Sequence, residues 1–221
     1  NCMWLKGVVM KAHYNGLIPR NPFIQFHISP NVKEREYLTE DELKAVMTHE
    51  FADSKLAYIR DIFIFASFTA LSFVDIQELT NDNIVEVNGE KWILSKRHKT
   101  KVAFQVKLLD IPLQIVERYR PMQKDNRIFP GLNYWSICKP LKRMIRECGI
   151  TKSISFHCSR HGFATLALSK GMPIESVSRV LGHTNIVTTQ LYAKITTQKL
   201  DNDLTMFGDK LSKTFNGITM S

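Results

Sequence analysis

The sequence predicts an α+β fold that is mainly α-helical and carries one small three-stranded antiparallel sheet. Two observations lead to this prediction. Apolar residues recur at helical spacing along most of the chain, whereas residues 83–110 change to the alternation that is typical of strands. Glycines and prolines separate the helical segments. The 221 residues are enough for one full domain and part of another.

The first predicted element is a helix over residues 1–16, which ends at Gly16 before two prolines. We interpret residues 1–18 as the C-terminal end of a preceding domain. Residues 19–36 show little periodicity and are predicted to be a linker. Because the sequence does not start with Met, we expect it to be a piece of a longer protein.

The main domain is expected over residues 37–212. Thr39 and Glu42 have the spacing of a capping box, which predicts that a helix begins there. A longer apolar helix is expected over Ser54–Ala70, followed by a turn and a short helix in residues 71–80. Residues 213–221 are interpreted as a tail.

The predicted sheet comes next, with a tight turn at Asn88 and Gly89. Its strands are expected at residues 84–87, 91–94 and 102–109. After Pro112 the pattern is helical again, with Gly or Pro signals between segments. The predicted helices are residues 112–119, 134–148, 157–170, 173–181, 185–193 and 197–211.

The composition favours a globular protein, with 44% hydrophobic and 23% charged residues. No apolar run reaches the roughly 18 residues that a membrane span needs, so we predict no membrane association and a cytoplasmic location. The four cysteines lack CxxC spacing and are interpreted as reduced thiols. The HCSRH stretch at residues 157–161 has no second ligand pair, so we predict no metal and no cofactor.

The positive charge of the chain is concentrated in two segments. The formal net charge is +9; residues 91–120 hold eight basic and two acidic side chains, and residues 139–160 hold six and one. Such a distribution favours a polyanionic partner, for which nucleic acid is the default. The alternative is a basic face that is merely solvated.

Four side chains within a short stretch could converge on one anion. His157 and Arg160 are three positions apart in a predicted helix and therefore share a face. His183 follows Gly182, where the backbone can turn freely, and Tyr192 completes the set. Arginine binds two phosphate oxygens, imidazole donates a hydrogen bond or moves a proton, and a phenol can attack phosphorus. A core tyrosine is the alternative for Tyr192.

These residues stand in motifs that resemble the tyrosine recombinase (phage-integrase) family over about residues 36–211. The segments that match, in family order, are YLTEDEL, SKRHKTK, HCSRHGFAT and LGHTNIVTTQLYAKI. The resemblance implies the catalytic-domain fold of DNA breaking-rejoining enzymes, with residues 1–18 as the end of a core-binding domain. It implies a site-specific recombinase or integrase that cuts and rejoins DNA through a covalent 3′-phosphotyrosine, without metal or ATP.

The resemblance also implies a role for each site residue. Tyr192 would be the nucleophile and Arg160 the second arginine of the family's set. His157 would accept a proton or bind the phosphate, and His183 would hold the phosphate. Lys99 best matches the hairpin lysine that protonates the leaving 5′-oxygen.

Three neighbours of these residues receive other predictions. Lys96 and Lys101 match the proton-donating position less well and are predicted to bind DNA. His161 is expected to point to another face of its helix than Arg160, and to serve packing or to support the site.

The sequence departs from the family at one position. The usual arginine of the family's TGLRxxE motif is replaced by Ser72, with Asp75 at the acidic position. Loss of a guanidinium from a phosphate site should weaken transition-state stabilisation by about 2–4 kcal/mol. Integrases of Bacteroides-type conjugative elements resemble this sequence in lacking that arginine. We hypothesise that Arg97 replaces it, with Arg60 as a weaker candidate; the alternative is a catalytically impaired DNA-binding protein.

The expected partners follow from the resemblance. They are double-stranded DNA and further protomers in a tetrameric synapse, with the C-terminal segment exchanged between neighbours. The expected setting is a mobile element in a bacterial nucleoid. The recombination site, and the choice among integration, excision, inversion and resolution, are not predicted.

Overall fold

The computed structural model describes residues 2–25, 36–98, 101–123, 125–193 and 197–214. It divides into two units, residues 1–34 and residues 35–221. The predicted linker falls largely on residues 26–35, which lie outside the described residues, as do residues 215–221 of the predicted tail. In the first unit, helix α1 (Cys2–Tyr14) confirms the predicted N-terminal helix.

The second unit begins with α2 (Glu40–Thr48), whose start is fixed by the predicted capping box. The Glu42 amide donates to Thr39 Oγ1 at 3.2 Å, and the Thr39 amide donates to Glu42 Oε2 at 2.7 Å. Helix α3 (Ser54–Thr69) follows and contributes ten buried residues. It contacts α2, α5, α6 and α7, so it is the central helix of the core.

The predicted three-stranded antiparallel sheet is confirmed. It has the order β1 (Ile84–Val87), β2 (Glu90–Lys96) and β3 (Ala103–Lys107). Ile93 pairs with Ile84 on one side and with Val106 on the other, and all its side-chain surface is buried. Asn88 and Gly89 both have positive φ, as a type I′ hairpin turn requires.

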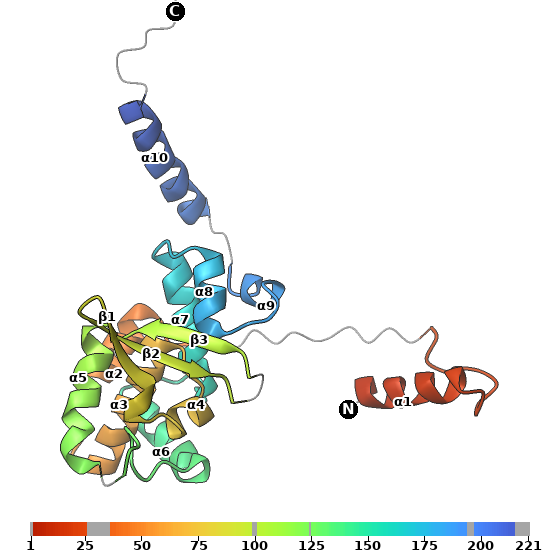
Figure 1. Cartoon of the computed structure of the whole chain (residues 1–221), viewed down its shortest axis with the longest axis horizontal. Coiled ribbons are helices and arrows are strands. Elements are labelled where there is room, and N and C mark those ends of the chain that lie inside the picture. Colours follow the sequence, from red (N-terminus) through yellow and green to blue (C-terminus); the bar gives the residue numbers. More distant parts are fainter. Residues whose placement is uncertain (1, 26–35, 99–100, 124, 194–196, 215–221) are drawn as a thin grey trace, which may run out of the picture. The chain divides into compact units, whose positions relative to one another are not determined.

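The helical prediction for the rest of the chain is confirmed, with shifts at the ends. The helices, labelled in Figure 1, are α4 (Phe73–Gln77), α5 (Asp110–Tyr119), α6 (Tyr134–Glu147), α7 (His157–Ser169), α8 (Ile174–Leu181), α9 (Val187–Gln190) and α10 (Thr197–Thr214). Two short 3₁₀ helices are η1 (Asn81–Asn83) and η2 (Arg120–Met122). None of the described helices combines the length and apolar composition that crossing a bilayer requires.

The contacts of α8 position the candidate site. Helix α8 touches α7, α9 and strand β3, so α7 and the β2–β3 hairpin both lie against it. A second apolar cluster, which includes Val177 and Leu181 of α8, closes this junction, and Tyr192 packs against it.

Candidate active site

Helix α7 brings three site side chains to one side. His157, Arg160 and His161 are separated by three and four positions, which places them on neighbouring parts of the helix surface. The rings of His157 and His161 are 4.5 Å apart between centroids, and His161 is 5.2 Å from the ring of Tyr192. The tyrosine therefore reaches the α7 histidines within one chain.

The position of His161 differs from the expectation. It is buried and it does pack, but against Tyr192 and His157, so it forms a wall of the site. The sequence signal was available, because His161 is four positions after His157 and shares its face.

Arg160 is held by the carbonyl ends of two helices. Its Nη1 donates to the carbonyl of Ala70 at 2.8 Å, and its Nη2 donates to the carbonyl of Leu181. Ala70 ends α3 in a left-handed conformation, and Leu181 is the last residue of α8. Carbonyls at helix C-termini lack partners in their own helix and carry partial negative charge, so they suit a buried cation.

Burial, followed by repulsion from Arg97, lowers the pKa of Arg160 to about 10. The guanidinium remains protonated at neutral pH. Tyr192 and Asp75 act on this pKa in the opposite direction.

Arg97 follows β2 directly and is also buried, with 5% of its surface exposed. Its Nη1 donates to Asp75 Oδ2 at 2.7 Å, its Nη2 donates to the carbonyl of Val180, and its Cζ lies 4.0 Å from the ring centroid of Phe104. Burial lowers its pKa, and the ion pair with Asp75 opposes that shift. The guanidinium is thus fixed on several sides.

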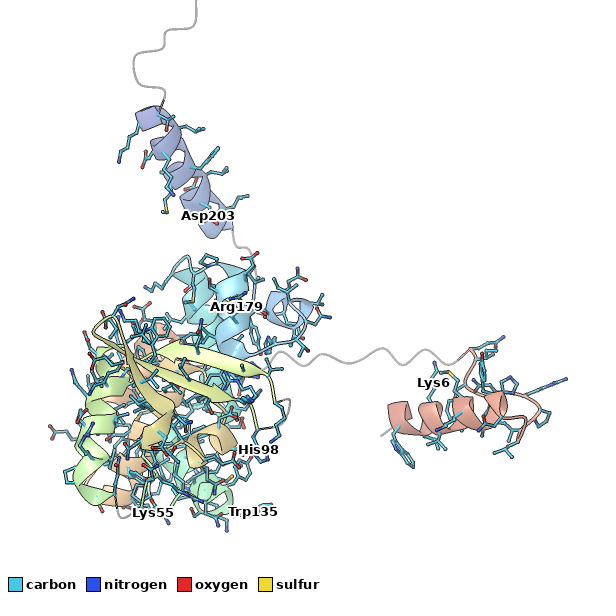
Figure 2. The ribbon with its side chains drawn as sticks, in the orientation of Figure 1. Lys6, Lys55, His98, Trp135, Arg179 and Asp203 are labelled. Atoms are coloured by element: carbon cyan, nitrogen blue, oxygen red, sulfur yellow. The ribbon has the colours of Figure 1, made fainter. Side chains whose placement is uncertain are left out.

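Ser72 turns its hydroxyl to the same carboxylate. Its Oγ donates to Asp75 Oδ2 at 2.7 Å and accepts from the Asp75 amide, so it also caps α4. The other carboxylate oxygen accepts the His98 amide at 3.0 Å; His98 is labelled in Figure 2. Burial alone would raise the pKa of Asp75, but the hydrogen bonds from His98, Arg97 and Ser72 lower it.

His183 is half-buried beside both arginines. Burial, followed by repulsion from Arg160, Arg97 and His157, lowers its pKa to about 4. Its Nδ1 lies 2.9 Å from Thr189 Oγ1. The imidazole is therefore neutral at pH 7 in the free protein, able to donate one hydrogen bond and accept another.

The other predicted site residues lie apart from this group or outside the description. Lys96 and Lys101 are exposed at the hairpin, where the Lys101 amide donates to the carbonyl of Arg97 at 2.8 Å. Lys99 lies outside the described residues. Arg60 donates to Asp61 at 2.9 Å and to the carbonyl of His49 at 2.9 Å. Neither partner contacts Asp75, Arg97 or Arg160 in the interactions described above.

The assembled group has the chemistry of an anion site with a nucleophile. Arg97 comes from the hairpin, Arg160 and His161 come from α7, and His183 follows α8; the ring of Tyr192 lies 5.2 Å from that of His161. Such donors can bind a phosphodiester and stabilise the charge that develops during attack on phosphorus.

Comparisons with known proteins show which family the chain resembles. Residues 36–199 match the model of the phage integrase family. The tyrosine recombinase XerA of Pyrococcus horikoshii is 32% identical over 177 residues, which are 74% of this chain and 58% of that protein. The tyrosine recombinase XerD of Listeria innocua is 26% identical over 204 residues, 85% of this chain and 67% of that protein. The chain thus spans less than two thirds of the Pyrococcus protein.

Solved structures with the same fold confirm the predicted fold class. The Tn1549 transposon integrase in complex with a circular intermediate DNA aligns with a TM-score of 0.77 at 18% identity, over 91% of this chain and 76% of that one. The XerA recombinase aligns with a TM-score of 0.62 at 20% identity, over 90% and 72%. At these identities the likeness concerns the fold.

Proposed function

Because this chain belongs to the phage integrase family, as its motifs predict, we propose that it is a site-specific DNA recombinase with Tyr192 as nucleophile. One observation carries the proposal: the ring of Tyr192 lies 5.2 Å from that of His161, which is adjacent to Arg160 on α7 of the same chain. The names of the related proteins, tyrosine recombinases, support the same activity.

The proposed reaction is a transesterification. The Tyr192 oxygen forms a bond to phosphorus, the bond from phosphorus to the 5′-oxygen breaks, and a 3′-phosphotyrosine results. The phenolic proton passes to a base, and the proposed acceptor is His157 at the exposed start of α7. The leaving 5′-oxygen takes a proton from a hairpin lysine, and Lys99 remains the proposed donor. Rejoining reverses these steps without ATP.

The two arginines would hold the phosphate. Arg160 binds its oxygens as a planar fork, and His183 donates a hydrogen bond. A phosphate beside His183 would raise the pKa of that imidazole, because a nearby negative charge favours the protonated form.

Arg97 is the proposed replacement for the arginine that Ser72 lacks. Its guanidinium binds the carboxylate of Asp75, to which Ser72 also donates. Arg97 and Arg160 donate to the carbonyls of the consecutive residues Val180 and Leu181, so the two guanidiniums lie at the same end of α8. Within the described part of the chain, the buried Nε of Arg97 finds no acceptor. Arg60 is not favoured, since Asp61 and His49 hold it.

Covalent capture tests the nucleophile. Nicked suicide duplexes that tile the DNA around the gene for this chain are incubated with the protein and separated under denaturing conditions. We expect a covalent protein–DNA band that Tyr192→Phe abolishes, while Tyr37→Phe, a tyrosine at the start of α2, leaves it. A band that survives Tyr192→Phe would remove this tyrosine from the mechanism.

The alternative, a catalytically impaired DNA-binding protein, rests on Ser72. It predicts shifted complexes that never become covalent. Arg97→Ala tests whether Arg97 replaces the missing arginine, but this variant leaves Asp75 buried without its ion pair. The double variant Asp75→Ala/Arg97→Ala removes both partners and serves as the better-folded companion. Both should lose capture if Arg97 acts on the phosphate.

The proposed partners are double-stranded DNA and further protomers of the same chain. The exposed Lys96 and Lys101 would bind the DNA backbone. Helix α10 carries four exposed apolar side chains on one face, and we propose that it docks on a neighbouring protomer in a tetrameric synapse. The likeness to Bacteroides-type element integrases and an association with the nucleoid remain predictions.

A further inference from the structure

The C-terminal end of α8 binds both arginines of the site. The carbonyl of Val180 accepts from Arg97, and the carbonyl of Leu181 accepts from Arg160. Consecutive carbonyls thus fix two like charges side by side, where the negative end of the helix dipole offsets part of their repulsion. The helix stops immediately afterwards at Gly182.

Gly182 lies directly against Arg97. It adopts a left-handed conformation with φ +61°, and a Cβ added there would lie 2.9 Å from Nε and 3.0 Å from Cγ of Arg97. Asp75, the Val180 carbonyl and the Phe104 ring surround the rest of that side chain, so it has little room to withdraw. Among the described glycines, the others show no heavy atom within 4 Å of an added Cβ.

We propose that Gly182 is a positioning residue for Arg97. Its missing side chain lets the arginine cross from the hairpin over the end of α8 to Asp75 and lie beside Arg160. The catalytic consequence of this inference rests on the proposed function, whereas the contact between Gly182 and Arg97 does not depend on it. A side chain at position 72, which caps α4, reaches Asp75 directly, as the Ser72 hydroxyl does at 2.7 Å. Such a side chain does not have to cross Gly182.

A double-mutant cycle in urea tests the contact without DNA. Gly182→Ala is measured in the natural chain and in the Arg97→Ala background, with Gly171→Ala as the matched control. Gly171 has φ +88° near the end of α7 and open space around an added Cβ, so it reports backbone strain alone. We expect Gly182→Ala to lower the urea midpoint more than Gly171→Ala does, and the excess to disappear when Arg97 is absent. An equal loss in both backgrounds overturns the inference.

The catalytic consequence is measured by covalent capture on the same nicked duplexes. A displacement of a phosphate-binding group by about 1 Å can lower a rate about 100-fold. We expect a loss of that size for Gly182→Ala and little loss for Gly171→Ala. We expect Ser72→Arg to restore capture in the Arg97→Ala chain, and Gly182→Ala to have little further effect in that background; an undiminished loss there contradicts the positioning role. If Arg97→Ala itself captures DNA normally, the role proposed for Arg97 fails, whereas the urea cycle still decides the contact.

Discussion

At the scale of single residues, the site is organised by one carboxylate. Asp75 accepts hydrogen bonds from the Ser72 hydroxyl, the Arg97 guanidinium and the His98 amide. Serine at position 72 therefore leaves the acidic partner of the usual family arginine in place. A cation from another element can then form the ion pair with Asp75. The buried carboxylate requires a positive neighbour, and any element can supply it.

Removing the charge of Asp75 should destabilise the fold. Asp75→Asn leaves Arg97 buried without its ion pair, and breaking such a pair lowers the free energy of unfolding by about 3 kcal/mol. Urea denaturation measures the change. Glu78→Gln is the control: Glu78 forms an exposed pair with His98 at 2.8 Å, and its loss should change stability by less than about 0.5 kcal/mol. Similar values for both variants would mean that the buried pair contributes little.

The lowered pKa of His183 predicts a pH dependence of stability. The pKa falls from 6.5 to about 4 on folding, so the unfolded chain binds more protons between these values. Stability from this group is fully present above pH 6.5 and decreases as the pH falls towards 4. NMR titration of the imidazole measures the pKa, and His183→Asn should flatten this part of the stability curve. In Arg97→Ala the pKa should rise, since one repelling charge is removed; a lower pKa in that variant contradicts the assignment of the neighbours.

At the scale of secondary structure, elements with local signals were predicted well. The capping box at Thr39, the Asn88–Gly89 turn and the helix periodicity are all set by neighbours in sequence. Helix α9 is shorter than predicted, because Asn185 Oδ1 accepts the Val187 amide at 2.9 Å and so lies before the helix. The prediction placed Pro112 at the start of helix α5. The helix begins two residues earlier, at Asp110, so Pro112 lies inside its first turn.

The site was predictable in part for the same reason. The His157–Arg160 spacing indicates a shared face. Arg97 directly follows β2 and continues the alternation of Ile93 and Ser95, which points it inward. The carbonyls of Ala70, Val180 and Leu181 that hold the arginines carry no sequence signal. They are backbone groups whose meeting depends on the packing of α3 and α8, which only the three-dimensional structure reveals.

The capping box of α2 should have a measurable effect. Thr39→Ala removes the side-chain acceptor for the Glu42 amide and should lower the free energy of unfolding by about 1 kcal/mol. Lys152 keeps Glu42 anchored at 2.6 Å, so the helix should still form. The control is Thr48→Ala at the other end of α2, where the hydroxyl donates to a carbonyl of its own helix, and it should be close to neutral in the same urea experiment. A larger loss from Thr48→Ala would contradict the capping argument.

At the scale of the whole molecule, charge and apolar surface serve different contacts. The basic residues of the hairpin lie on the same segment as Arg97, so the element that completes the site also carries the proposed DNA-binding lysines. Exposed apolar side chains lie on α10, as they also do on α1. Those of α10 at spacings of four, three and four form a stripe along one face: Leu200, Leu204, Phe207 and Leu211.

This α10 stripe predicts cooperative assembly on DNA. Phe207 and Leu204 are 58% and 59% exposed, more than the two outer members of the stripe, so they should contribute most to a protomer contact. The double variant Leu204→Ser/Phe207→Ser should weaken assembly of two or more protomers on a duplex about tenfold, because apolar anchors of an interface are removed. Binding of one protomer should stay unchanged, since the basic hairpin is intact. Native gel shifts over a range of protein concentrations separate the two steps, with Lys210→Gln on α10 as the control. If both steps weaken equally, α10 packs within its own chain and its apolar stripe supports the fold of a single protomer.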